Sequence, residues 1–247
     1  MGGIDIGSRY IKYVLLEDDG VLSFRKKETG HEPLSVCLEL IGNPGPGRLI
    51  ATGYGRYLLE VHGNVQTITE IKAVARGARE VFPSCRTIID IGGQDTKVIS
   101  LNKYGRVLSF EMNDRCAAGT GKFLEIMAKA LGYTLETFGS HCSSENSPVR
   151  INSMCTVFAE SEVIGLISKG AKRDIIAQAL HRSIVDKVTA LIKRIGIKED
   201  IVFAGGCAKN LCLKRMFEER LGYEVLVHEN PDMLGALGAA RYALEND

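Results

Sequence analysis

The sequence predicts a duplicated α/β fold, with two lobes arranged around a cleft. The main observation is an internal repeat: residues 4–20, IDIGSRYIKYVLLEDDG, align without a gap to residues 89–105, IDIGGQDTKVISLNKYG, at an offset of 85. Seven of the seventeen positions are identical, which is hard to produce by chance. Helical segments follow each copy, so each lobe would open with the same strands and be covered by helices. With 247 residues, 45% of them hydrophobic, the chain can bury a real core.

Each copy of the repeat is predicted to form three antiparallel strands. The first strand ends in Asp-x-Gly, a tight turn leads to the second, and a glycine turns the chain into a third that begins VLSF in both copies. Apolar residues at helical spacing predict helices over 68–82, 120–132, 155–170 and 174–196. We expect Thr67 and Glu70 to form a capping box at the first of these. A strand over 200–206, a helix from about Lys209, a strand over 224–228 and a helix over 233–245 complete the chain.

The boundary between the lobes is expected near residues 82–85, FPSC, where a predicted helix ends before a proline. Lobe I would comprise residues 1–85 joined by the C-terminal helix 232–247, and lobe II residues 86–231, which carry two notable cysteines. The small residues of GALGAA (235–240) predict that the last helix crosses another helix closely at a hinge.

Composition excludes several classes of partner. The net charge is +1, which provides no electrostatic attraction to nucleic acid or to an anionic membrane. No secretory leader is recognisable, and no apolar run approaches the roughly 20 residues that span a bilayer. A cytoplasmic protein is therefore expected. Its seven cysteines are expected to be buried side chains, metal ligands or redox groups rather than disulfides.

The repeated Asp-Ile-Gly turns are suited to hold a phosphate chain between them. Glycine lets backbone N–H groups approach phosphate oxygens closely, and an aspartate at a strand end suits a Mg²⁺ ion that keeps several waters. A third segment, VFAGGCAKN (202–210), ends a strand in two glycines just before a helix, a suitable backbone for adenine and ribose. The alternative is that the turns need glycine only for backbone conformation. The duplication and the third segment together favour a nucleotide.

These segments resemble, in the same order, the phosphate and adenosine motifs of the superfamily of acetate and sugar kinases, Hsp70 and actin. The resemblance implies an actin-like, ribonuclease H-like ATPase fold with ATP or ADP and Mg²⁺ in the cleft. The residues implied to bind the nucleotide are Gly7, Ser8, Arg9, Gly92, Gly93, Gly205 and Gly206. Asp5 and Asp90 would lie near Mg²⁺, with Asp5 holding it through water. Gln94 or Asp95 would orient the attacking water, and the sequence does not choose between them.

The segment NDRCAAGTGKFLE (113–125) is similar to a P-loop, but the P-loop interpretation fails. Its frame begins with Cys116 and has Phe123 in place of the final hydroxyl residue. Its glycines are instead expected to allow a tight turn into the following helix. Cys155, in NSMCTVFAESEVIGL (152–166), also directly precedes a helix. Helix N-termini stabilise negative charge, so both cysteines are candidate thiolates for an anionic cluster. The alternative is that both are small buried side chains.

A [4Fe–4S] cluster needs four thiolates, which a twofold-symmetric homodimer of this chain would supply from Cys116 and Cys155 of each copy. The two cysteine segments resemble the cluster-binding segments of ATP-dependent activators of 2-hydroxyacyl-CoA dehydratases. That family includes ATPase subunits of benzoyl-CoA reductase and reductases of double-cubane cluster proteins. The resemblance implies one cluster per homodimer and ATP-driven transfer of a low-potential electron to an iron–sulfur partner enzyme. Ferredoxin or flavodoxin would be the electron donor.

Two other functions fit part of the same pattern. A small-molecule kinase of the same fold would use the nucleotide cleft and have merely structural cysteines. A nucleotide-gated sensor would bind ATP without electron transfer. The electron-transfer interpretation further predicts that ATP rotates the lobes and repositions the helices that follow Cys116 and Cys155.

Overall fold

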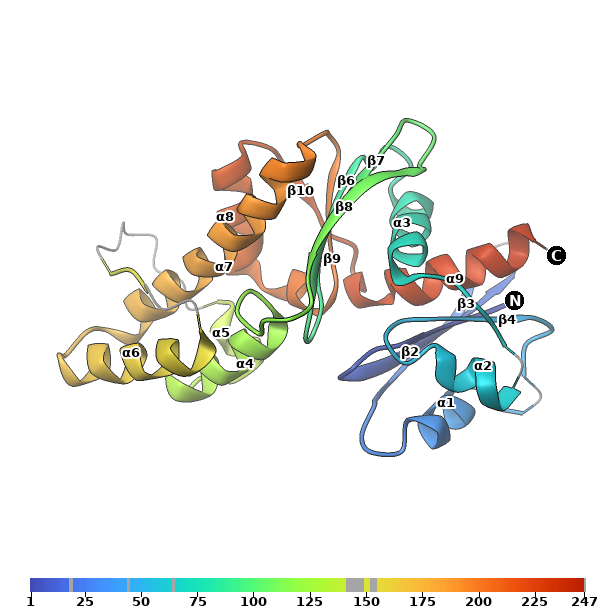
Figure 1. Cartoon of the computed structure of the whole chain (residues 1–247), viewed down its shortest axis with the longest axis horizontal. Coiled ribbons are helices and arrows are strands. Elements are labelled where there is room, and N and C mark those ends of the chain that lie inside the picture. The colour runs from blue at the N-terminus through green and yellow to red at the C-terminus, as the bar shows by residue number, and fades with distance from the viewer. Residues whose placement is uncertain (18–19, 44, 64, 141–148, 152–154, 247) are drawn as a thin grey trace.

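The computed structural model describes residues 1–17, 20–43, 45–63, 65–140, 149–151 and 155–246. Residues 152–154 of the second cysteine motif therefore lie outside the described residues. Two five-stranded sheets organise the chain. In Figure 1 the meander of β1–β3 (blue) and the meander of β6–β8 (teal to green) lie in separate halves, and the yellow and orange helices belong to the half of the second meander. The predicted duplicated α/β fold is confirmed. Within the described part of the chain, no helix is long and apolar enough to cross a membrane.

The first sheet has the strand order β3-β2-β1-β4-β5. Its predicted meander is formed by β1 (Gly2–Ile6), β2 (Tyr10–Glu17) and β3 (Gly20–Glu28), which pair antiparallel. Two short strands extend it in parallel, β4 (Leu49–Thr52) and β5 (Gln66–Thr67). The helices α1 (Pro33–Ile41) and α2 (Tyr57–Gly63) accompany this sheet. Sequence reasoning missed the last four elements because each is too short to establish a clear hydrophobic period.

The second sheet has the equivalent order, β10-β9-β6-β7-β8. Its meander is β6 (Thr87–Ile91), β7 (Thr96–Leu101) and β8 (Val107–Asn113), and β9 (Ile201–Ala204) and β10 (Val225–Leu226) extend it in parallel. The strands of the two repeated hairpins also pair in the same register. Asp5 is paired with Lys12 across β1 and β2, and Asp90 is paired with Lys97 across β6 and β7. Each pair therefore places a carboxylate and an ammonium group side by side at the end of its hairpin.

Most long helices begin and end within a few residues of their predicted bounds. They are α3 (Glu70–Val81), α4 (Gly121–Ala130), α6 (Thr156–Ser168), α7 (Arg173–Ile195), α8 (Leu211–Leu221) and α9 (Leu234–Glu245). Short helical turns complete the set: α5 (Leu135–Phe138) and the 3-10 helices η1 (Gly206–Lys209) and η2 (Pro231–Met233). A large core of buried apolar side chains joins the second sheet to α4, α6, α7 and α8.

The start of α3 differs from the prediction. Its N-cap is Thr69, whose side chain accepts a hydrogen bond from the Lys72 backbone N–H at 3.4 Å. Thr67 lies in β5, and the Glu70 carboxylate contacts Lys97 instead of capping the helix. The capping-box prediction was wrong because a buried ammonium group competes for the same carboxylate more strongly than a backbone N–H.

The predicted close crossing of the last helix is confirmed. A Cβ atom on Gly77 of α3 would lie 1.9 Å from the Leu234 carbonyl oxygen, and one on Gly238 of α9 would lie 1.8 Å from the Ala73 oxygen. Only glycine at both positions allows these backbones to touch. Figure 1 shows α3 and α9 between the two sheets, where the chain passes from one sheet to the other.

Candidate nucleotide cleft and paired cysteines

A cleft of about 710 Å³ is lined by loops of both sheets. It gathers every residue that the sequence assigned to the nucleotide or to its hydrolysis. The end of β1 and the turn after it contribute Asp5, Gly7, Ser8 and Arg9; the end of β6 and the turn after it contribute Asp90, Gly92, Gly93, Gln94 and Asp95; and the segment after β9 contributes Gly205 and Gly206. Segments that are far apart in the chain thus form one cavity, while the role of each residue stays a prediction.

The two phosphate-loop candidates have the same shape and face each other. The Gly7 N–H donates to the Tyr10 oxygen at 3.2 Å, and the Gly92 N–H donates to the Asp95 oxygen at 2.9 Å. A Cβ atom on Gly93 would lie 3.4 Å from the Arg9 Cβ atom. The loops are therefore close enough for one anionic chain to contact both.

Each phosphate-loop aspartate is held by the lysine of its own hairpin. Lys12 Nζ lies 2.8 Å from Asp5 Oδ2, and Lys97 Nζ lies 3.8 Å from Asp90 Oδ2 and 2.7 Å from Asp95 Oδ2. Burial alone would lower the pKa of Lys97, but the surrounding carboxylates outweigh burial and raise its pKa. Both lysines stay charged and neutralise a cleft that is otherwise rich in carboxylates. Lys12 and Lys97 occupy equivalent positions in the sequence repeat, and this match is the sequence feature that indicates their shared role.

Glu70 is a cleft residue whose position the sequence did not indicate. Its Oε1 atom lies 2.8 Å from Lys97 Nζ, and it lines the same cavity. Burial raises the pKa of Glu70 to about 7; Lys97 opposes this shift, while Asp5, Asp95 and Asp90 add to it. A carboxylate that titrates near neutral pH beside a phosphate site is able to accept or hold a proton there.

The Asp5 carboxylate fits a water-mediated Mg²⁺ site. Its Oδ2 atom contacts Lys12, but its buried Oδ1 atom has no hydrogen-bond partner among the described residues. A Cβ atom on Gly53 would lie 2.4 Å from Asp5 Oδ1, and one on Gly205 would lie 2.5 Å from Asp90 Oδ1. Both glycines have positive φ angles, 88° and 81°. Glycine therefore leaves room for the carboxylate oxygen beside it at each position, and sequence analysis overlooked Gly53.

The adenosine-segment candidate is anchored from beneath by buried polar contacts. Asn210 Nδ2 lies 3.0 Å from His181 Nε2 of α7, and Asn210 Oδ1 accepts a bond from the Leu213 N–H at 2.9 Å. His181 Nδ1 lies 2.7 Å from the Ala177 oxygen, so Nδ1 carries the proton and Nε2 accepts from Asn210. Burial lowers the pKa of His181 to about 4, which keeps the ring neutral.

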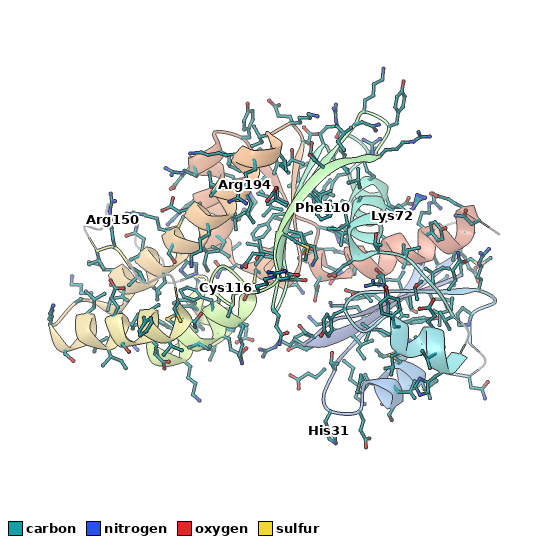
Figure 2. All side chains as sticks on the ribbon, viewed as in Figure 1. His31, Lys72, Phe110, Cys116, Arg150 and Arg194 are labelled. Atoms are coloured by element: carbon teal, nitrogen blue, oxygen red, sulfur yellow. The ribbon has the colours of Figure 1, made fainter. Side chains whose placement is uncertain are left out.

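Cys116 and Cys155 differ from the other free cysteines by their exposure. Both are exposed, whereas Cys37, Cys85 and Cys207 are buried. The alternative that Cys116 and Cys155 are small buried side chains is therefore wrong. Cys155 is the N-cap of α6, and Figure 2 shows Cys116 in the loop that leads from β8 into α4.

The remaining described cysteine also departs from expectation. Cys212 is disulfide-bonded, although the sequence predicted reduced cysteines throughout.

The two exposed thiols could supply two of the four ligands that a four-iron cluster needs. The part of the chain that the structure describes holds no group of three or more His, Cys, Asp or Glu side chains that could bind a metal. A cubane requires four thiolates, so a second copy of the chain would have to contribute the other two. Lys187 of α7 lies within electrostatic reach of both thiols: burial lowers its pKa, while Cys116 and Cys155 oppose that shift. A nearby ammonium group favours anionic sulfur.

Two equivalent sheets with facing Asp-Gly loops around a cleft define an actin-like ATPase. Comparison with known families is more specific. The BadF/BadG/BcrA/BcrD ATPase family matches residues 46–243, and the chain belongs to this family. The chain is an ATPase of that kind.

Named relatives of this family are similar over nearly their whole length. The 2-hydroxyisocaproyl-CoA dehydratase activator of Clostridioides difficile is 41% identical, over 98% of this chain and 94% of the relative. The (R)-2-hydroxyglutaryl-CoA dehydratase activating ATPase of Acidaminococcus fermentans is 39% identical, over 98% of this chain and 95% of the relative. A solved structure of the C. difficile activator with bound ADPNP has a TM-score of 0.91 and 39% identity, and the match covers 100% of this chain and 94% of that one.

Proposed function

We propose that this ATPase is an iron–sulfur reductase that passes a low-potential electron from a [4Fe–4S] cluster to a partner metalloenzyme. The observation that carries the proposal is the pair of exposed thiols: Cys116, on a segment that adjoins the nucleotide cleft, and Cys155, at the N-terminus of α6. The relatives are named as dehydratase activators, which supports a partner of the 2-hydroxyacyl-CoA dehydratase type. A double-cubane cluster protein is the other partner class consistent with the sequence, and ferredoxin or flavodoxin would supply the electron.

In this proposal the cleft binds ATP with Mg²⁺ and hydrolyses it. The loop from Gly7 to Arg9 and the loop from Gly92 to Gln94 contact the phosphates through backbone N–H groups. Asp5 holds Mg²⁺ through water, and Asp90 lies beside it. Gln94 or Asp95 orients the attacking water. The backbone of Gly205 and Gly206 packs against the adenosine.

The cluster is proposed to lie on the twofold axis of a homodimer. Two copies together supply four thiolates, whereas one copy supplies two. The surface beside Cys155 suits such contact: Val157 and Phe158 of α6 are each 66% exposed, and Ile164 is 56% exposed. Burying these apolar side chains against a second copy would be favourable by about 25 cal/mol per Å² of area removed from water.

The bound cluster would supply one-electron chemistry at low potential, and the chain would control it by moving. We propose that residues 1–85 with 232–247 and residues 86–231 move relative to each other as two lobes. ATP binding between the loops would then reposition the loop of Cys116 and the N-terminus of α6. Iron–sulfur potentials respond to charge, hydrogen bonding and solvent exposure, so such a movement changes the driving force for electron transfer.

Anaerobic purification tests the proposal. We expect a brown dimer with about four iron atoms per two chains, because one cubane bridges the copies. Cys116→Ala and Cys155→Ala should each lose the iron and the brown colour. Cys85→Ala, which removes a buried thiol away from the cleft, is the matched control and should retain both. Iron-free protein after anaerobic reconstitution with iron and sulfide would refute the cluster and leave an ATPase of another function.

A further inference from the structure

The helix that follows Cys116 is bonded directly to the second phosphate-loop candidate. The Gly121 N–H donates to the Gly92 oxygen at 2.9 Å, and the Lys122 N–H donates to the Gly93 oxygen at 2.8 Å. A Cβ atom on Gly121 would lie 2.9 Å from the Gly92 oxygen, so only glycine permits this approach. The first turn of α4 therefore moves with the loop that faces the phosphates.

The loop that carries Cys116 is bonded to β7 and β8 of the second sheet and to the residue that precedes α4. Asn113 Nδ2 donates to the Cys116 oxygen at 2.8 Å, and Asn113 Oδ1 accepts from the Cys116 N–H at 3.3 Å. Thr96 Oγ1 donates to the Gly119 oxygen at 2.7 Å, and Thr120 Oγ1 donates to the Ala117 oxygen at 2.6 Å. Because these bonds hold the loop to the second sheet as well as to the start of α4, Cys116 moves with the second sheet.

One ion pair joins α4 to the opposite side of the cleft. Arg9, in the turn between β1 and β2, pairs with Glu125 on the second turn of α4. The same carboxylate lies 3.5 Å from Lys122 Nζ on its own helix. Arg9 is also a residue expected to contact phosphate, so Glu125 and a bound triphosphate are rival anions for one guanidinium group.

We infer that Glu125 is a positioning residue, which holds Arg9 and the start of α4 together until the terminal phosphate of ATP displaces its carboxylate. The inference rests on the proposed function. When Arg9 turns to the phosphate, α4 loses its tether to the first sheet but keeps its two bonds to the second phosphate loop. Cys116 then follows the second sheet alone. ADP, which lacks the terminal phosphate, leaves the ion pair in place.

Calorimetric titration of the full chain with ADP and with a non-hydrolysable ATP analogue tests this inference. In Glu125→Gln the affinity for the ATP analogue should rise about two- to fivefold, because a partly exposed ion pair contributes roughly 0.4–1 kcal/mol and no longer competes. The affinity for ADP should not change. A residue with a merely structural role would instead weaken both affinities. Glu125 is partly exposed, with 33% of its side chain accessible, so the variant is expected to fold.

Two further variants make the test specific. Glu219→Gln removes an exposed carboxylate on α8 that does not line the cleft, and it should leave the ratio of the two affinities at the wild-type value. Glu125→Asp keeps the charge on a shorter side chain and should give an intermediate ratio. A wild-type ratio in Glu125→Gln would overturn the inference, and so would an equal change in Glu219→Gln.

The movement of Cys116 has its own readout. The chain is freed of iron by a chelator, treated with iodoacetamide, and modification at Cys116 is followed by peptide mass spectrometry. Without nucleotide, Glu125→Gln should be modified at the rate that wild-type protein reaches only with the ATP analogue. Equal rates for nucleotide-free variant and nucleotide-free wild type would contradict the inference. Neither the titration nor the modification assay needs a cluster. Iron-free protein would therefore refute the proposed function, whereas these two assays would still decide the role of Glu125.

Discussion

Glu70 Oε1 lies 2.8 Å from Lys97 Nζ, and this contact joins the first turn of α3, at the nucleotide cleft, to the buried lysine of β7. Lys97 simultaneously contacts Asp95 and approaches Asp90, so a single ammonium group balances three carboxylates. Lys97 does not fully compensate the effect of burial and of the neighbouring carboxylates, which still raise the pKa of Glu70 to about 7. Several testable consequences depend on this arrangement and on the glycines around it.

The titration of Glu70 predicts a pH dependence of stability. Its pKa is raised from 4.5 to about 7, so the unfolded chain releases this proton at a lower pH than the folded chain does. Stability should therefore fall as pH rises from about 4.5 to about 7 and then level off. In the wild-type protein the free energy of unfolding, measured in urea, should decline by on the order of 3 kcal/mol over this range. In Glu70→Gln the decline should be absent. Glu219→Gln, an exposed control on α8, should keep it; an unchanged profile in Glu70→Gln would contradict the prediction.

Removing the shared ammonium group should destabilise the protein strongly. Lys97 has only 2% of its side chain exposed, and Lys97→Met would leave the buried Asp90 and the partly exposed Glu70 and Asp95 without their counter-charge. We expect a loss of about 3–5 kcal/mol in the free energy of unfolding, measured in urea. Lys103→Met removes an exposed lysine nearby and should change stability by less than about 0.5 kcal/mol. Equal effects of the two substitutions would show that Lys97 makes no special contribution.

Two glycines of the AGTGK segment should respond differently to alanine. At Gly121 a Cβ atom would lie 2.9 Å from the Gly92 oxygen and 3.2 Å from Cys207 Sγ, so Gly121→Ala should push α4 off the phosphate loop and weaken ATP binding at least tenfold. Gly119 has a φ angle of 98° but more open surroundings, so Gly119→Ala should cost about 1–2 kcal/mol of stability and change affinity less. Calorimetry and urea unfolding separate the two effects, and a reversed order would refute this assignment.

The glycines that touch the two aspartates should be needed for hydrolysis. Gly53→Ala and Gly205→Ala would each place a methyl group within 2.5 Å of a carboxylate oxygen, and both positions have positive φ. We expect Mg²⁺-dependent ATP hydrolysis to fall at least tenfold in both variants, because the methyl group displaces Asp5 or Asp90. Gly47→Ala, in open space, is the control and should hydrolyse ATP at the wild-type rate. Retained hydrolysis in Gly53→Ala would argue against Asp5 as the Mg²⁺ residue.

Much of the site was predictable because its signals are local. The two Asp-x-Gly turns, the paired lysines and the Gly205-Gly206 segment each lie within one short stretch, and the repeat identifies the first two as equivalent. Alternating and helical periodicity then placed the meanders and the long helices. The short elements β4, β5, α1 and α2 were missed, and with them Gly53, because a strand of four residues carries almost no periodic pattern.

The sequence by itself determined the duplication, the two meanders and the candidacy of Cys116 and Cys155, since each of these depends on short local motifs. Only the tertiary structure decided that Glu70 pairs with Lys97, that Gly121 rests on the second phosphate loop and that Arg9 pairs with Glu125. Arg9 and Glu125 are 116 residues apart. Such contacts depend on how the helices and sheets pack, and a local pattern specifies which face a helix buries without specifying which distant residue it will meet.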